Sequence, residues 1–323
     1  MKQTVKAAGA VKGTKVTKVT KVTKVTKATK ATKASPTAGL EPLPEIMIEA
    51  LVRDALLEDL GRAGDITTDA IVPRDAMSTC LVVARQPGVI SGTDAARLAF
   101  RLLDRDMVVT IGKPDGSRVS PGDVVMQVQG RTRAILSAER VALNLLCHLS
   151  GVATATATLV DAVRPHKARI ACTRKTTPGL RALEKHAVRA GGGSNHRFGL
   201  DDAVLIKDNH VAAAGGVKPA IERARAAIGH LVKLEVEVDT LAQLEEVMSM
   251  AAHPDAVLLD NMTPDQLRQA VAIVKGRAVT EASGRVTSAT VAAIAATGVD
   301  LISAGWITHS APVLDLGLDW QQG

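Results

Sequence analysis

Hydrophobic and polar residues follow one pattern in the first half of the chain and another beyond residue 168. In the first half, apolar residues at helical spacing predict a helix over 44–60, which Gly61 ends. Short apolar runs bounded by turn residues then predict strands, at 78–84, 88–91, 107–111 and 123–128. Two further helices are expected, a long one over about 134–149 and a second over 151–164. These elements together indicate an α+β domain.

Beyond residue 168 short apolar runs alternate regularly with helical stretches. Strands are predicted to begin near residues 170, 204, 232, 256, 278 and 300, with spacings close to one βα unit each. Polar residues fall at the carboxyl ends of these strands: Arg174 and Lys175, Lys207, Glu235 and Glu237, Asp260, Ser283, Ser303 and Gly305. Active sites of βα barrels lie on that face. The pattern alone therefore predicts a parallel α/β unit of about six strands, with a site at the strand ends.

The formal net charge of +7 comes from the amino terminus. Residues 1–40 contain ten Lys and no acid, so the remainder carries 30 basic and 33 acidic side chains. Lys recurs at every third position over 12–33, a period that gives neither helix nor strand a face to bury. We expect this tail to be disordered. It is either a lysine-rich arm that binds nucleic acid by counterion release or a dispensable extension.

The cysteines and the apolar runs indicate a cytoplasmic protein. Cys80, Cys147 and Cys172 are odd in number and far apart, so neither a disulfide framework nor a CxxC metal site is predicted. The amino terminus lacks the apolar core of a secretory signal. No apolar run approaches the roughly 20 residues of a membrane span, so no membrane association is expected.

Positive charge in the remainder concentrates in residues 172–210, which hold four Arg, three Lys and three His against four acids. Here cations follow two short apolar runs, as expected of a site for a polyanion, because charge-assisted contacts are about twice as strong as neutral hydrogen bonds. The candidates are Arg174, Lys175, His196, Arg197 and Lys207. By contrast, a solvated helix face is predicted for Arg181, Glu184, Lys185 and Arg189. Structural roles are expected for Cys172, His148, His166, His186 and His253.

Several sequence motifs occur in a recognisable order. They are EDLGRAGDITT (58–68), AERVALNLLCHLSGVAT (138–154), TRKTTPGLR, GGGSNHRFGLDD, IKDNH, LEVEVD (234–239), LLDN (258–261), EASG (281–284) and GVDLISAGWITHS (298–310). Over about residues 44–320 this order resembles the quinolinate phosphoribosyltransferases, the carboxylating nicotinate-nucleotide pyrophosphorylases. The resemblance implies an incomplete βα barrel at 151–305. It also implies an α+β sandwich domain at 41–150, completed by about 306–323.

The resemblance implies phosphoribosyl transfer from phosphoribosyl pyrophosphate to quinolinate with loss of CO₂, giving nicotinate mononucleotide and pyrophosphate for NAD biosynthesis. Both substrates are anions, so the site needs fixed positive charge to offset their repulsion. With no Tyr, two Phe and two Trp in the chain, cations rather than ring stacking are expected to hold quinolinate. Two alternatives stay open. One is a related phosphoribosyltransferase for nicotinate or another anionic ring, such as the paralogue of molybdenum transport operons. The other is a nucleic-acid-binding protein acting through the lysine tail.

The matched motifs assign roles to individual residues. The substrate-binding residues implied in and around the quinolinate site are Arg140, Thr173, Arg174, His196, Arg197 and Lys207. Arg140 is expected from the neighbouring subunit of a homodimer, and larger assemblies stay open. The implied catalytic residues are Lys175 and Lys207, at phosphoribosyl pyrophosphate oxygens, with Glu237 and Asp260, at Mg²⁺ and the ribose hydroxyls. Glu235 is a rival of Glu237, because strand alternation points both to one side.

Two loops are expected to bind the 5-phosphate through backbone N–H groups at helix starts. Their residues are Ser283, Gly284 and Arg285 in one loop and Ser303, Ala304 and Gly305 in the other. Ordinary barrel turns are the alternative. Arg285 stands where the family commonly has a second glycine, so it either adds a phosphate contact or tightens the loop.

Overall fold

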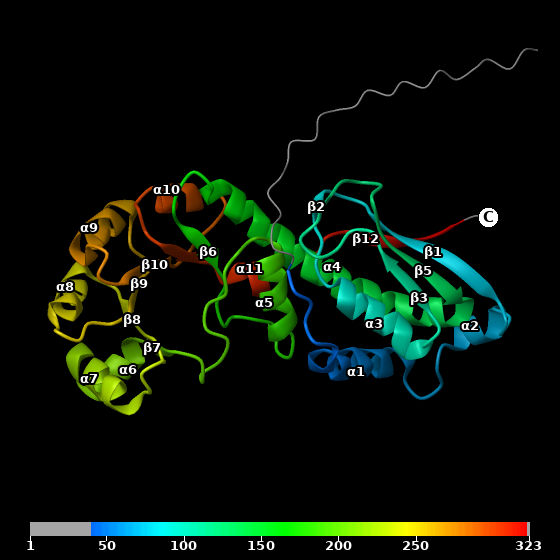
Figure 1. Ribbon diagram of the computed structural model, residues 1–323, viewed down its shortest axis with the longest axis horizontal. Coiled ribbons are helices and arrows are strands. Elements are labelled where there is room, and N and C mark those ends of the chain that lie inside the picture. Colours follow the sequence, from blue (N-terminus) through cyan, green and yellow to red (C-terminus); the bar gives the residue numbers. More distant parts are fainter. Residues whose placement is uncertain (1–39, 322–323) are drawn as a thin grey trace, which may run out of the picture. The chain divides into compact units, whose positions relative to one another are not determined.

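The first sheet is antiparallel and has four strands in the order β12-β1-β5-β3. The computed structural model describes residues 40–321, so the predicted lysine-rich tail lies outside the described residues apart from Leu40. The strands of this part of the chain are β1 (Met77–Ala84), β2 (Gly88–Val89), β3 (Val108–Ile111), β4 (Arg118–Val119), β5 (Val124–Arg131) and β12 (Leu316–Trp320). Strand β12 pairs with β1, so residues from the end of the chain complete this sheet (Figure 1).

Three helices belong to this part of the chain. They follow η1 (Glu45–Met47) and are α1 (Glu49–Leu60), α2 (Ile66–Ile71) and α3 (Thr93–Leu103). The helix predicted over 44–60 is confirmed, with a first turn of 3₁₀ type and Gly61 at its end. Helices α2 and α3 and the short strand β4 were not predicted. The apolar side of α3 is buried against the long helix α4, and Phe100 is 1% exposed.

A single helix, α4 (Thr132–Val163), replaces the two helices predicted over 134–149 and 151–164. The prediction of a break near Gly151 was wrong, because this glycine serves close packing within a continuous helix. A Cβ atom built at Gly151 would lie 2.2 Å from the backbone oxygen of Pro312. Glycine therefore lets the returning chain cross the helix at this point.

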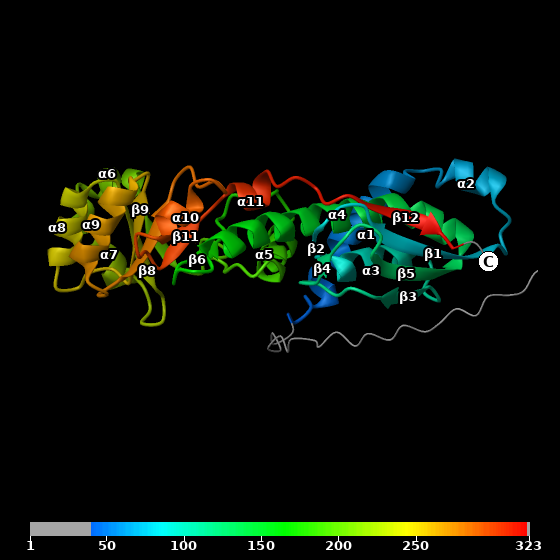
Figure 2. The same cartoon turned by 90° about the horizontal axis from the view of Figure 1, so that it is seen from above.

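Helix α4 lies at the centre of the described unit and contacts α3, β5, α5 and β6 (Figure 2). By length and composition it could cross a membrane, whereas no span was expected from the sequence. Yet 67% of its most apolar window is buried inside the protein, as expected of a core helix.

The second sheet contains six parallel strands in the order β6-β11-β10-β9-β8-β7. They are β6 (Arg169–Ala171), β7 (Val204–Ile206), β8 (Leu234–Val238), β9 (Ala256–Asp260), β10 (Val279–Ser283) and β11 (Leu301–Ser303). Their starts agree within two residues with the predicted ones. Within residues 40–321, β6 and β7 form opposite edges of the sheet and do not pair. The fold class of an incomplete βα barrel with a separate α+β part is confirmed.

Helices follow each of the barrel strands. They are α5 (Arg181–Ala190), α6 (Asp208–Ala214), α7 (Val217–Ala227), α8 (Leu241–Ser249), α9 (Pro264–Val274), α10 (Val291–Ala295) and α11 (Trp306–His309). Helices α6 to α10 surround the sheet, while α5 and α11 lie beside α4 (Figure 1). Two segments beside β6, 172–180 and 191–203, contain no helix or strand. A one-residue parallel bridge, Ala171 to Ser194, holds the second segment beside β6. Both segments carry predicted site residues.

Candidate active site

A cavity of about 530 Å³ opens at the carboxyl ends of the barrel strands. It is lined by Thr173, Arg174, Lys175, His196, Arg197, Leu205, Lys207, Glu237, Leu258, Asp260, Glu281, Ser283 and Ser303. The parallel register explains how distant residues meet here, because all six strands end at the same edge of the sheet. Asp260, for example, is paired with Ser283 at the ends of β9 and β10.

Lys207 and Glu237 form an ion pair inside this cavity. Lys207 directly follows β7 and caps the start of α6, whereas Glu237 lies near the end of the neighbouring strand β8. The Lys207 side chain is 44% exposed, so its ammonium group is open to a ligand while Glu237 holds it in place. Asp260 ends the next strand and accepts a hydrogen bond from Asn261 Nδ2 at 2.6 Å.

Two arginines bring unpaired donors to the cavity wall. The Nε atoms of Arg174 and Arg197 are buried and have no hydrogen-bond partner among the described residues. Arg197 Nη1 donates to Ala203 O at 2.9 Å, which sets the direction of that guanidinium group. Burial and the neighbouring charge of Arg174 lower the pKa of Arg197. Two guanidinium groups that repel each other and keep free donors form a site for an anion.

His196 lies between two buried acids, Glu235, which the sequence indicated as a rival of Glu237, and Glu281, which was not predicted. Its Nε2 is 2.9 Å from Glu235 Oε2 and 3.7 Å from Glu281 Oε1. Burial opposes a charged imidazole, but the hydrogen bond to Glu235 and the charge of Glu281 outweigh it and raise the pKa of His196. Burial, together with the charge of Glu235, raises the pKa of Glu281 to about 7.

Glu281 was missed, although the sequence contained a signal for it. Glu281 lies two residues before Ser283 on β10, and residues two apart on a strand point to the same face. Because Ser283 was predicted at the site, Glu281 could have been predicted beside it. Leu205 and Leu258 were not predicted either, because an apolar strand residue is expected in the core whether or not it also lines a cavity.

The group of His196, Glu235 and Glu281 has ligand atoms within 4.8 Å of one another, a spacing that suits a metal ion. The raised pKa of Glu281 works against this, because a protonated carboxyl group is a poor ligand. Glu237 and Asp260 suit Mg²⁺ better, since they offer carboxylate oxygens near the ends of two adjacent strands that line one cavity.

The loops expected to bind phosphate have distinct backbones. Gly284 has φ of 96°, and a Cβ atom there would lie 2.2 Å from Asn261 Oδ1, so this position requires glycine. Arg285 adopts φ of 48°, which explains why glycine suits this position, and its side chain is exposed. Ser283 and Ser303 line the cavity. The residues that follow them, Gly284, Arg285, Ala304 and Gly305, do not line it.

The prediction of a solvated face on α5 was wrong for three of its four residues. Glu184 is fully buried and Lys185 is 1% exposed, and both are hydrogen-bonded to the chain around the cavity. Arg181 is half-buried with three hydrogen bonds, and only Arg189 is exposed. The charges repeat at helical spacing, but the face they form meets two irregular segments instead of water.

Arg140 lies apart from the other predicted residues. It is exposed on α4 and does not line the cavity of its own chain. The structure therefore brings together the predicted residues of the barrel and leaves Arg140 on a separate surface.

An incomplete βα barrel with paired cations and acids around one cavity defines an enzyme that acts on small anions. The family model "Quinolinate phosphoribosyl transferase, N-terminal domain" matches residues 65–150, and the model of the C-terminal domain matches residues 152–319. The chain belongs to the quinolinate phosphoribosyltransferase family.

Similar proteins extend over most of the chain. The nicotinate-nucleotide pyrophosphorylase [carboxylating] of Mycobacterium leprae is 48% identical over 280 residues, covering 83% of this chain and 95% of that protein. A probable nicotinate-nucleotide pyrophosphorylase [carboxylating] of Bacillus subtilis is 42% identical over 274 residues, or 85% of this chain and 93% of that protein. The crystal structure of NadC from Streptococcus pyogenes superposes with a TM-score of 0.83 at 39% identity, covering 87% of this chain and 100% of that one.

Proposed function

We propose that this chain transfers the phosphoribosyl group of phosphoribosyl pyrophosphate to quinolinate and releases CO₂, giving nicotinate mononucleotide and pyrophosphate for NAD biosynthesis. The observation that carries this proposal is the pair of arginines that line the cavity, each with a buried Nε that has no partner within residues 40–321. Quinolinate has carboxylates on adjacent ring carbons, and guanidinium groups bind carboxylates through two parallel hydrogen bonds. Arg174, Arg197 and His196 are the proposed contacts of these carboxylates, with Thr173 beside them.

The other charged residues of the cavity suit phosphoribosyl pyrophosphate. Lys175 and Lys207 supply ammonium groups for its pyrophosphate oxygens. Glu237 and Asp260 would hold Mg²⁺, which neutralises charge on the leaving pyrophosphate when bound, and would contact the ribose hydroxyls. The loops that begin at Ser283 and Ser303, the two serines that line the cavity, are proposed to bind the 5-phosphate.

The reaction needs positioning and charge stabilisation and no covalent nucleophile. As the bond to pyrophosphate breaks, Lys175 and Lys207 stabilise the negative charge on the leaving group. The ring nitrogen of quinolinate attacks the ribose anomeric carbon, and Arg174 and Arg197 hold the ring in line for that attack. The resulting pyridinium then stabilises the carbanion left when the adjacent carboxylate departs as CO₂, and a proton takes its place.

The active assembly is proposed to be a cytoplasmic homodimer. Arg140 is exposed on α4 and does not line the cavity of its own chain, which supports a role in the site of a neighbouring subunit. The three cysteines are free, which supports a reducing compartment.

A substrate comparison tests the function. The protein is incubated with Mg²⁺, phosphoribosyl pyrophosphate and either quinolinate or nicotinate, and the mononucleotide is measured. We expect turnover of quinolinate and little turnover of nicotinate, since nicotinate lacks the second carboxylate. Arg174→Ala and Arg197→Ala should each raise the KM for quinolinate. Preferential use of nicotinate would instead identify a related phosphoribosyltransferase.

A further inference from the structure

Four basic residues of the cavity, including the three proposed to hold quinolinate, lie on two segments without helix or strand. Arg174 and Lys175 lie in residues 172–180, and His196 and Arg197 lie in 191–203. Irregular segments are generally more mobile than the elements that they connect. A carboxylate clamp, however, works only if its donors keep their spacing to within about 0.5 Å. The contacts that hold these segments therefore bear on how the site selects its ligand.

Lys185 of α5 contacts both segments and links them. Its Nζ donates to His196 O at 2.9 Å and lies 3.1 Å from Cys172 Sγ. The side chain is 1% exposed, so these contacts replace the water that an ammonium group otherwise requires. Cys172 begins the first segment and His196 lies in the second.

Glu184, the preceding residue of α5, holds the first segment by a different contact. Its Oε2 accepts a hydrogen bond from Thr177 N at 3.1 Å, and its Oε1 is 2.8 Å from His148 Nε2 on α4. Glu184 is fully buried, so both oxygens depend on these partners. The segment that carries Arg174 is thereby linked to the central helix.

Arg181, one helical turn earlier, contacts both segments. Its Nε donates to Thr176 Oγ1 at 3.0 Å and its Nη2 to Arg174 O at 3.4 Å. Its Nη1 donates to Phe198 O at 3.2 Å, in the other segment. Residues 181, 184 and 185 share one face of a helix, because positions three and four apart are neighbours.

We propose that this face of α5, formed by Arg181, Glu184 and Lys185 and here called the α5 bracket, sets the spacing of Arg174 and Arg197 and so determines selectivity for a ring with two adjacent carboxylates. The bracket residues are positioning residues, because they contact the segments 172–180 and 191–203 and do not line the cavity. The proposal rests on the proposed function and adds the residues that tune it.

A purely structural role would predict a different outcome. Loss of a structural contact lowers stability and reduces the fraction of folded enzyme, which leaves the KM of both substrates unchanged. Loss of positioning weakens binding of the ring substrate most, because Arg174, His196 and Arg197 all lie on the two segments. Only Lys175 among the proposed contacts of phosphoribosyl pyrophosphate does so, and the KM for that substrate therefore changes less. The ratio of the two KM values therefore separates the two roles.

The test compares Lys185→Met with Lys185→Gln and with the control Arg189→Met, which removes an exposed cation from the same helix. Met fills the buried space without a charge, and Gln can still donate one hydrogen bond to His196 O. We expect Lys185→Met to raise the KM for quinolinate on the order of tenfold and to change that for phosphoribosyl pyrophosphate less than twofold. Lys185→Gln should recover part of the loss, and Arg189→Met should behave as wild type.

Three outcomes would overturn the proposal: equal changes in both KM values, an unchanged KM for quinolinate, or an equal effect of Arg189→Met. If Lys185→Met does not fold, Arg181→Met carries the same test, because Arg181 is only half-buried. Wild-type protein that fails to turn over quinolinate would refute the proposed function and the selectivity built on it. If the wild type turns over quinolinate and its KM for quinolinate is unchanged in Lys185→Met and Arg181→Met, only the role of the α5 bracket is refuted.

Discussion

At the scale of single residues, acids hold the cations of the cavity in place. Glu237 pairs with Lys207, and Glu235 pairs with His196 at 2.9 Å. An anionic ligand must compete with these acids, so each one lowers the affinity for the ligand but fixes the position of its donor. The arginines keep unpaired donors, which makes them the stronger sites for carboxylates.

Lys207→Ala should reduce kcat/KM on the order of 10- to 100-fold. Removing one partner of a buried charge pair commonly costs about 2 to 5 kcal/mol, and the partial exposure of Lys207 reduces that effect. Lys218, whose side chain is 63% exposed, is the control, and Lys218→Ala should stay within about twofold of wild type. Similar steady-state losses in both variants would show that the site is misplaced.

Glu281→Gln should flatten the dependence of stability on pH. Burial raises the pKa of Glu281 from 4.5 to about 7, so the folded state binds this proton more tightly than the unfolded state does. The free energy of unfolding therefore falls as the pH rises from about 4.5 to 7, by about 2 to 3 kcal/mol from this group. Urea denaturation at pH 5 and pH 8 measures the change. Parallel profiles of wild type and Glu281→Gln would contradict it.

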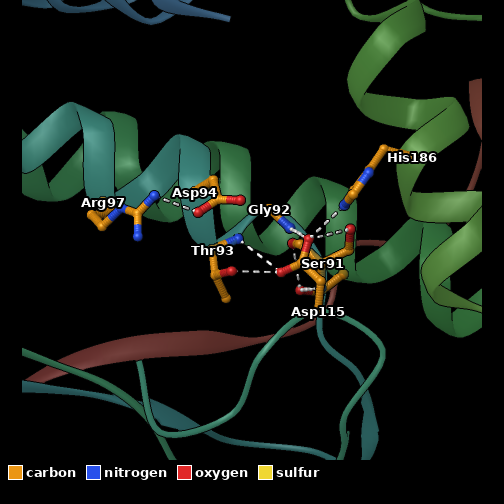
Figure 3. Close-up of polar contacts among 8 residues, drawn as sticks. Ser91, Gly92, Thr93, Asp94, Arg97, Asp115 and His186 are labelled. Atoms are coloured by element: carbon orange, nitrogen blue, oxygen red, sulfur yellow. Dashed lines mark hydrogen bonds and ion pairs between the residues drawn. The ribbon is translucent and has the colours of Figure 1, made fainter. Parts of the chain in front are cut away.

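At the scale of elements, the start of α3 shows how loops and helices are joined (Figure 3). The residue before the helix is Gly92, which has no side chain to cap it. Asp115, from the loop between β3 and β4, accepts hydrogen bonds from Gly92 N at 2.9 Å and Thr93 N at 3.1 Å. His186 Nε2 of α5 lies 3.2 Å from the same carboxylate. Asp115 thus acts as the cap of α3 and links it to α5.

Asp115→Asn should destabilise the protein at pH 7 by about 1 to 3 kcal/mol, because the amide offers one acceptor atom in place of two. Burial opposes the charge of Asp115, but hydrogen bonds from His186, Gly92 and Thr93 lower its pKa below 3.8. Its contribution to stability is therefore complete above pH 3.8 and is lost as the pH falls through the lower, folded-state value. Urea denaturation at pH 7 and pH 3 should show a shrinking difference from wild type. If the difference in the free energy of unfolding were the same at both pH values, ionised Asp115 would not be the cap of α3.

Element order could be predicted from the sequence because buried parallel strands appear as apolar runs separated by helices. The errors have local causes. A glycine inside a helix signals either a break or a close contact, and at Gly151 the contact with Pro312 decides. Charged residues along one face of a helix predict polar surroundings. For Lys185 and Glu184 these surroundings include backbone groups of the protein in place of water. Periodicity does not distinguish backbone from water.

At the scale of the whole molecule, contacts between distant segments could be predicted only from the motif resemblance and not from the hydrophobic pattern. The pairing of Cys80 with Trp320 places the end of the chain in the first sheet, and no local signal near Leu316 announces it. Arg140 is the extreme case, since its proposed role requires a second chain. On its own it reads as an exposed residue of α4.

Mixing two inactive variants should restore activity if Arg140 acts across a two-fold interface. Arg140→Ala and Lys207→Ala are dissociated together in equal amounts and reassociated. Half of the dimers are then mixed, and one of their two sites carries neither substitution, so roughly a quarter of wild-type activity should return. Subunit exchange is verified with differently tagged chains. If exchange is complete and activity stays at the level of the separate variants, the shared site is refuted.

The central claim is that one cavity joins two anions and then removes a carboxylate. The most direct measurement supplies Mg²⁺, phosphoribosyl pyrophosphate and quinolinate labelled in the carboxylate next to the ring nitrogen, and follows labelled CO₂, pyrophosphate and mononucleotide together. We predict that the three products appear in equal amounts and that Arg174→Ala slows all three alike. Mononucleotide that retains the label, or release of pyrophosphate without CO₂, would contradict the account.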